Sequence, residues 1–174
     1  MNHGSILQQL HCRGRPASRE PPQPVYNSRY GGLQLRLALV RENSFHETII
    51  INSADKVYNL VKEELISSDR EVMLSILLTS SLRLIGVETV AIGNRNSCGT
   101  YPAELFKSAI LANASFLILC HNHPSGDPEP SRADITFTET IVRAGELLGI
   151  RVNDHVIVTA HGYRSLKALD LPAL

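Results

Sequence analysis

The sequence lacks a net charge, a closely spaced pair of cysteines and a long hydrophobic run. Its 17 basic residues balance its 17 acidic residues, so no overall electrostatic field draws the protein to nucleic acid or to anionic lipid. It also has no stripe of basic and aromatic residues of the kind that follows a phosphate backbone. Any contact with DNA would therefore have to be local, and these absences count against DNA as the substrate.

Hydrophobic runs in this sequence are short. The run SFLILC, at residues 115–120, is typical and falls far below the roughly 20 residues that a helix needs to cross a bilayer. The first residues, MNHGSILQQLHCRGRP, contain no uninterrupted apolar stretch of the kind that forms a secretory signal. We therefore expect a cytoplasmic protein that does not associate with membranes.

The three cysteines, Cys12, Cys98 and Cys120, are odd in number and widely spaced. This spacing argues against a disulfide framework and against a zinc site built from cysteines alone. Cys120 directly precedes a histidine, but it ends an apolar run. We interpret it as a buried residue and not as a metal ligand.

The composition is that of a folded protein, with 43% hydrophobic and 20% charged residues. A chain of 174 residues is long enough for one domain with its own core. Residues 1–31 mix Gly, Pro, Ser and Arg without hydrophobic periodicity, which predicts a disordered N-terminal tail. The domain is therefore expected over residues 32–174.

The remaining sequence alternates between the hydrophobic periods of strands and helices. Ser53 and Ser131 stand where helix N-caps are needed. The order of elements predicts an α/β domain with a central mixed sheet flanked by helices. The predicted strands cover residues 33–42, 71–81, 84–93 and 115–120, the predicted helices cover residues 52–65, 100–114 and 131–149, and a further strand and a short element follow.

The clearest candidate site consists of His121, His123 and Asp134. The histidines are separated by one residue and follow a predicted strand, on a loop where α/β folds often place functional groups. Asp134 follows on the first turn of the next helix, from which its carboxylate can turn back toward the histidines. Histidine nitrogens and a carboxylate oxygen suit Zn²⁺, and three protein ligands leave a fourth position for water, as in catalytic zinc sites. We predict one zinc ion per chain.

Such a site favours hydrolysis. Zinc lowers the pKa of water from about 16 to about 7, which provides a nucleophile at neutral pH. A nearby carboxylate must still move protons, and Glu71, at the start of a predicted strand, is the candidate. Ser131, between the histidines and Asp134, is placed to donate a hydrogen bond to the oxyanion of a tetrahedral intermediate.

The run HNHPSGDPEPSRAD resembles the JAMM signature of the JAB/MPN metalloproteases and is similar to its RadC branch. YPAELFK and DHVIV are also similar to RadC segments, and the motif-bearing part covers residues 52–174. The helix-hairpin-helix segment of longer RadC proteins, which is associated with DNA contact, has no counterpart in this sequence. The resemblance implies a cytidine-deaminase-like fold and a JAMM-type peptidase or isopeptidase, with metal ligands His121, His123 and Asp134 and catalytic residues Ser131 and Glu71.

Several alternatives remain open. Glu104 rivals Glu71 as the acid/base, because the match of Glu71 rests on strand position and not on a fixed spacing. Asp154 and His155, expected after a strand, either orient a metal ligand or form a structural hydrogen-bonded pair. The substrate is expected to be a peptide or a ubiquitin-like conjugate. The same residues could instead serve a metal-dependent nuclease, a DNA-repair-associated factor or a binding module without catalysis.

Overall fold

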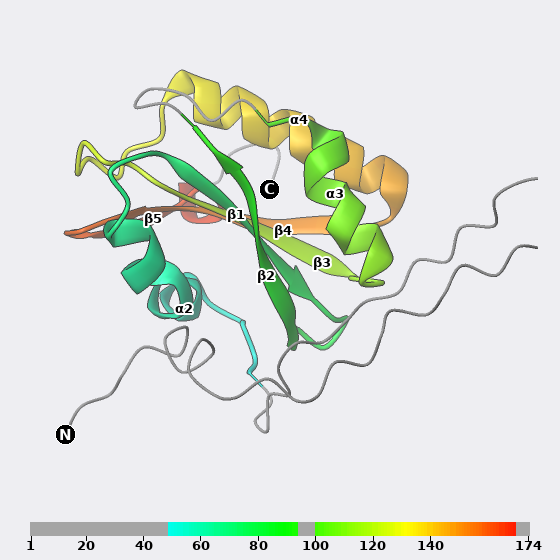
Figure 1. Cartoon of the computed structure of the whole chain (residues 1–174). Helices are drawn as coiled ribbons and strands as arrows, with labels where there is room; N and C mark the ends of the chain where they lie inside the picture. Colours follow the sequence, from blue (N-terminus) through cyan, green and yellow to red (C-terminus); the bar gives the residue numbers. More distant parts are fainter. Residues whose placement is uncertain (1–48, 94–99, 170–174) are drawn as a thin grey trace, which may run out of the picture. The chain divides into compact units, whose positions relative to one another are not determined.

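The computed structural model describes residues 49–93 and 100–169 (Figure 1). The predicted tail over residues 1–31 and the predicted strand over residues 33–42 lie outside this part of the chain. The elements, in chain order, are α2 (Ala54–Ile66), β1 (Val72–Leu78), β2 (Leu84–Ile92), α3 (Pro102–Leu111), β3 (Phe116–Asn122), α4 (Arg132–Leu148), β4 (Arg151–Thr159), β5 (Gly162–Ser165) and the 3-10 helix η2 (Lys167–Leu169).

The five strands form one sheet in the order β2-β1-β3-β4-β5. Only the pair β3-β4 is parallel, whereas the other three neighbouring pairs are antiparallel. Helix α4 makes the crossover that a parallel pair requires. The predicted α/β architecture with a central mixed sheet is therefore confirmed.

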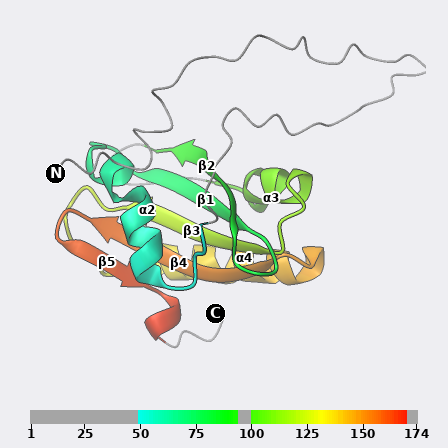
Figure 2. The ribbon, with the colours of Figure 1, turned by 90° about the horizontal axis from the view of Figure 1, so that it is seen from below.

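Helices cover both faces of the sheet. Helix α2 lies on one face, and α3 and α4 lie on the other, as Figures 1 and 2 show. The side chains of β1 alternate between the two cores: Leu74 and Ile76 pack with α2, whereas Met73 and Leu77 pack with α3 and α4. The same alternation in β3 and β4 decides which polar side chains meet at the site.

Local sequence sets the ends of the two helices that lie nearest to the site. The hydroxyl of Ser53 accepts a hydrogen bond from Lys56 N and caps α2. Ser131 and Asp134 form a reciprocal capping box at the start of α4. Gly149 ends α4 with a φ of 69°, a left-handed conformation that glycine adopts without steric cost. Both predicted N-caps are confirmed.

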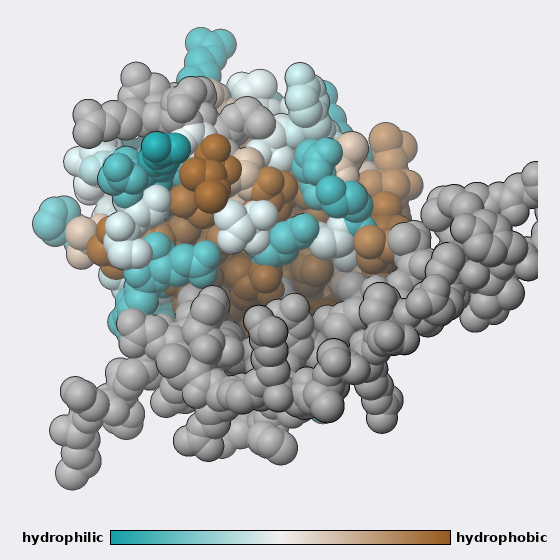
Figure 3. All heavy atoms as spheres, in the orientation of Figure 1, coloured by the Kyte–Doolittle hydropathy of each residue, from teal (hydrophilic) through white to brown (hydrophobic). Residues whose placement is uncertain are grey.

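Exposed apolar side chains gather at the C-terminal ends of α3 and α4. These side chains are Ile110, Leu111, Leu147 and Leu148, and brown spheres mark this region at the right of Figure 3. The two helix ends precede β3 and β4, so this surface lies at the end of the sheet where β3 begins, away from the histidines. No helix in the described part of the chain is long and apolar enough to span a membrane.

Candidate metal centre

Strand β3 positions the two histidines. His121 lies within the strand, and the backbone N–H of His123 donates to Val158 O at 3.1 Å, which continues the pairing with β4. Successive strand residues point to opposite faces, so His121 and His123 share the face covered by α4, while Asn122 points toward α2. The prediction that both histidines lie on a loop was wrong for His121. It is 1% exposed, because both neighbouring strands extend far enough to pair with it.

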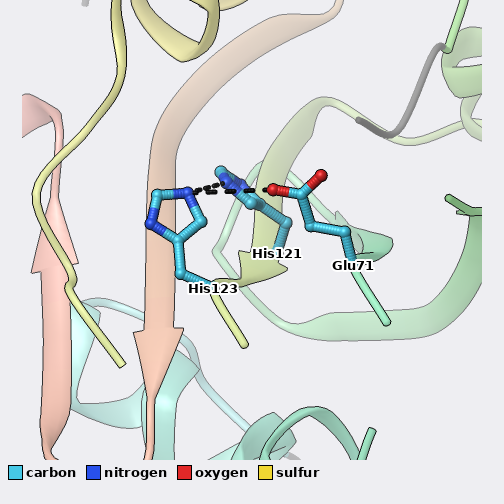
Figure 4. A group of neighbouring side chains, drawn as sticks. All are labelled: Glu71, His121 and His123. Atoms are coloured by element: carbon cyan, nitrogen blue, oxygen red, sulfur yellow. Dashed lines mark hydrogen bonds and ion pairs between the residues drawn. The ribbon is translucent and has the colours of Figure 1, made fainter. Parts of the chain in front are cut away.

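The antiparallel register of β1 and β3 brings Glu71 to the histidines. Met73 lies opposite His121. Glu71 is two residues before Met73, and His123 is two residues after His121. Because the two strands are antiparallel, Glu71 therefore lies beside His123. Figure 4 shows the three side chains turned toward one another. The Oε1 atom of Glu71 lies 4.0 Å from His123 Nε2. One ligand atom from each of Glu71, His121 and His123 lies within 4.8 Å of the other two.

The capping box of α4 brings Asp134 to the same place. Its Oδ2 atom accepts hydrogen bonds from Ser131 N at 2.7 Å and from Ser131 Oγ at 2.6 Å. Its Oδ1 atom lies 3.3 Å from His121 Nε2, and Oδ2 lies 3.6 Å from His123 Nε2. Because the helix cap already occupies Oδ2, Oδ1 is the oxygen of Asp134 best able to bind a cation.

The spacing of these atoms fits a small divalent cation. The two Nε2 atoms of His121 and His123 are 3.0 Å apart. In a tetrahedral zinc site with bonds of about 2.0–2.1 Å, ligand atoms lie about 3.3 Å from one another. His123 Nδ1 is 2.8 Å from Asp127 O, and a carbonyl only accepts, so the neutral ring keeps its proton on Nδ1 and leaves Nε2 free for a metal. The donors of His121, His123 and Asp134 therefore suit the predicted metal.

The electrostatics of the site also favour bound positive charge. Burial alone would raise the pKa of Asp134, but hydrogen bonds with His121, His123 and Ser131 outweigh burial and hold that pKa far below its usual range. The hydrogen bond with Asp134 raises the pKa of His123, although partial burial opposes it. A carboxylate that stays ionised beside two imidazoles is a suitable partner for a divalent cation.

A further histidine lies behind His121. The Nδ1 atom of His121 is 2.8 Å from His155 Nε2, and His155 Nδ1 is 2.6 Å from Thr138 Oγ1. The prediction that Asp154 and His155 follow a strand was wrong, because both belong to β4. They therefore point to opposite faces: His155 contacts the site, whereas Asp154 accepts a hydrogen bond from Ser165 on the other face.

The structure also places the remaining predicted catalytic residues. The hydroxyl of Ser131 donates to Asp134 Oδ2, so its proposed hydrogen bond to an oxyanion would require the hydroxyl to turn, and that role stays a prediction. The carboxylate of Glu104 pairs with Lys107 on the same helix at 3.0 Å. Of the two rival glutamates, Glu71 is the one that contacts the histidines.

Two residues that contribute to the site, Asn122 and Thr138, were not predicted from the sequence. Asn122 accepts a hydrogen bond from Val72 N at 2.8 Å and donates one to Arg70 O at 2.9 Å, so it holds the backbone on both sides of Glu71. Thr138 lies one helical turn after Asp134, and this spacing on α4 was the available signal for it. For Asn122 the signal was a polar residue within a strand that is otherwise buried.

A groove of about 480 Å³ borders His123. Apolar residues from the end of α2 and the end of β4, including Ile66 and Val158, form part of it. Polar residues, including Asp69 and Ser125, form the rest. The groove reaches the site at His123, and it also contains Asn122, whose side chain points toward α2, but its lining does not include His121, Glu71 or Asp134.

Comparison with known protein families finds a match that covers the whole site. A family model described as "RadC-like JAB domain" matches residues 51–171, a range that contains every residue of the site. The chain is also similar to proteins named UPF0758. It is 46% identical over 123 residues to one from Desulforamulus reducens, covering 71% of this chain and 54% of that protein.

Other UPF0758 proteins show similar coverage. The chain is 42% identical over 132 residues to a protein from Desulforudis audaxviator, covering 76% of this chain and 56% of the relative. It is 42% identical over 117 residues to one from Thermotoga maritima, covering 67% and 52%. The chain thus spans about half the length of the curated relatives that it matches.

Proposed function

The chain belongs to the family of RadC-like JAB domains, and from this membership we propose that it is a zinc-dependent hydrolase of peptide or isopeptide bonds. The observation that carries the proposal is the convergence of two imidazole nitrogens and a carboxylate, with Glu71 alongside. A binding module without catalysis would need the convergent donors for a metal but would have no need of an additional carboxylate at this position.

In this proposal His121, His123 and Asp134 hold the metal through Nε2, Nε2 and Oδ1. A bound zinc ion supplies an acidified water and polarises the carbonyl of the scissile bond. Glu71 remains outside the ligand set, because its Oε1 is 4.0 Å from His123 Nε2, whereas Asp134 lies 3.3 and 3.6 Å from the two histidines.

Glu71 is then the group that moves protons. Its carboxylate accepts a proton from the attacking water as the new C–O bond forms. It returns that proton to the leaving nitrogen as the C–N bond breaks, so that amide and water become a carboxylic acid and an amine. The side chain is 16% exposed, which leaves it accessible from the solvent side where a substrate arrives.

The lining of the groove that reaches the site at His123 favours a peptide as the substrate. It combines apolar residues with hydroxyl and carboxylate groups, a lining that suits a polypeptide segment. Asp69 in this groove and Glu71 beside the histidines would repel a phosphodiester backbone, and the zero net charge supplies no compensating attraction. We therefore favour an extended peptide or the tail of a ubiquitin-like conjugate over DNA.

The test begins with the purified chain. Its zinc content should be close to one ion per chain, and chelator-sensitive cleavage should appear with a peptide and isopeptide library and not with single-stranded or double-stranded DNA. Metal-dependent cleavage of DNA without cleavage of peptides would contradict the proposal. Folded protein that binds no metal would contradict it as well.

The role of Glu71 is tested by substitution. Glu71→Gln keeps the shape of the side chain but cannot accept a proton, so kcat should fall by about 10²–10⁴-fold while zinc is retained. Glu104→Gln is the matched control, since Glu104 pairs with Lys107 on α3, and it should be as active as the unmodified chain. The opposite pattern would assign the acid/base role to Glu104.

A further inference from the structure

A chain of three side chains leads from the candidate metal centre to helix α4. His121 and His155 are in contact through Nδ1 and Nε2 at 2.8 Å. The other nitrogen of His155 contacts Thr138 Oγ1 at 2.6 Å. All three residues are buried, with exposures of 1%, 0% and 2%, so water cannot replace any of these contacts.

The direction of these hydrogen bonds follows from a further partner of Thr138, the backbone carbonyl of Asp134. Thr138 Oγ1 lies 2.6 Å from Asp134 O. A carbonyl oxygen only accepts, and a hydroxyl has one hydrogen, so Thr138 donates that hydrogen to Asp134 O. The hydroxyl oxygen must then accept from His155, and the proton of the His155 ring must be on Nδ1.

The protonation of His155 then determines that of His121. His155 is fully buried, and its two ring nitrogens hydrogen-bond with Thr138 Oγ1 and His121 Nδ1, neither of which is an acidic group that would compensate a charge, so the ring is neutral and carries one proton. With this proton on Nδ1, the Nε2 atom of His155 can only accept. His121 must therefore donate from its own Nδ1, so that in the neutral ring Nε2, which lies 3.3 Å from Asp134 Oδ1, is the nitrogen with the free lone pair.

We propose that Thr138 and His155 are positioning residues that hold His121 in the one neutral tautomer able to bind a metal through Nε2. The proposal rests on the proposed metal site and explains how one of its ligands is prepared. Metal-binding histidines usually donate their second nitrogen to a carboxylate, a carbonyl or water. Here the acceptor is another imidazole, which itself has two tautomers, so a third residue must select between them.

The tautomer of His123 does not depend on Thr138 or His155. His123 Nδ1 contacts Asp127 O directly, and a backbone carbonyl already determines its tautomer. The two ligands therefore reach the same protonation state by different routes. Loss of the Thr138 hydroxyl should change the tautomer of His121 and leave the tautomer of His123 unchanged.

The first test needs no metal. In ¹⁵N-histidine-labelled, chelator-treated protein, at a pH about two units above the ordinary histidine pKa, the Nδ1 atoms of His121 and His155 should both be protonated, and the Nε2 atom of His155 should not be. Resonances are assigned from the spectra of His121→Gln and His155→Gln. A proton on His155 Nε2, or an Nδ1 atom without a proton on either ring, would overturn the proposal.

The second test measures zinc affinity by competition with a chromophoric chelator. Thr138→Val removes the hydroxyl and keeps the shape, so zinc should bind about 10–100-fold more weakly, as expected for the loss of a group that orients a ligand. Thr138→Ser keeps a hydroxyl and should restore most of the affinity. Unchanged affinity in Thr138→Val would overturn the proposal.

Thr140→Val is the matched control. Thr140 is on the same helix and makes the same kind of hydrogen bond, to Thr136 O at 2.9 Å, but it is exposed. This variant therefore loses an equivalent helix contact and should keep full zinc affinity, whereas an equal loss in both variants would overturn the proposal. If the unmodified chain binds no zinc, the proposed function fails, but the tautomers in the metal-free protein still decide whether His155 and Thr138 act as described.

Discussion

At the scale of single residues, Asn122 shows how one side chain can prepare a site without entering it. It lies between the two histidines in sequence but points to the other face of the sheet. Its amide binds both the carbonyl before Glu71 and the N–H after it. Asn122 is 2% exposed, its hydrogen bond with Val72 is buried and that with Arg70 is partly buried, and the two together hold the backbone on both sides of Glu71.

We predict that Asn122→Ala lowers kcat more than it lowers zinc affinity. A displacement of about 1 Å of a catalytic group can reduce the rate about 10²-fold, and the substitution releases the backbone of Glu71. It also leaves the buried N–H of Val72 unpaired, which costs about 1–3 kcal/mol, whereas Arg70 O keeps a hydrogen bond from Ser68 Oγ. Steady-state kinetics and zinc titration would measure the two effects separately.

Asn59→Ala is the control for this substitution, because Asn59 is exposed on α2 and accepts a hydrogen bond only from Lys62 in this structure. It should not change kcat. A normal kcat in Asn122→Ala would mean that the backbone clamp does not position Glu71.

At the scale of elements, the position of α4 depends on close packing at a glycine. A Cβ atom on Gly145 would lie 2.5 Å from the backbone oxygen of Ile150, an oxygen that cannot move without displacing the start of β4. The helix carries Thr138 about two turns earlier and Asp134 about three turns earlier. Close contact at Gly145 thus keeps the helix that bears a ligand against the sheet that bears the histidines.

Gly145→Ala should therefore destabilise the protein. Overpacking of this kind costs about 1–3 kcal/mol, which is more than the roughly 1 kcal/mol gained by replacing glycine with alanine in a helix. The free energy of unfolding from urea titration would show the loss. Gly86→Ala is the control, because a Cβ atom there has no neighbour within 4 Å; if both variants are equally stable, close packing at Gly145 is unimportant.

At the scale of the whole molecule, the site exists only in the folded chain. Its donors come from the start of β1, the end of β3 and the first turn of α4. The residues between Glu71 and Asp134 include three strands and a helix, so an unfolded chain does not hold these side chains together. Metal binding should therefore be coupled to folding.

Zinc should raise the melting temperature of the chelator-treated protein. A ligand present at about 100 times its Kd adds about 2.7 kcal/mol to the free energy of unfolding, a shift on the order of 10 °C for a domain of this size. Thermal unfolding with and without zinc would measure it. In His123→Gln most of this shift should disappear; a full shift in that variant would place the zinc elsewhere.

The sequence by itself determined the fold class and the residues with metal chemistry. Hydrophobic periods predicted the helices and strands of the described part, because burial requires a period of two in strands and about 3.6 in helices. The short run from His121 to Asp134 carried the candidate ligands, since it contains the histidines and the helix cap that turns Asp134 toward them. These features depend on neighbouring residues along the chain.

Only the tertiary structure decided which distant residues meet. The register of β1 against β3 placed Glu71, and not Glu104, beside the histidines. The parallel pairing of β3 with β4 brought His155 behind His121, and the packing of α4 added Thr138. Register and packing depend on the whole hydrophobic core, so no local pattern reveals them. For this reason the candidate metal ligands could be named from the sequence, while the residues that contact them from behind became visible only in the folded molecule.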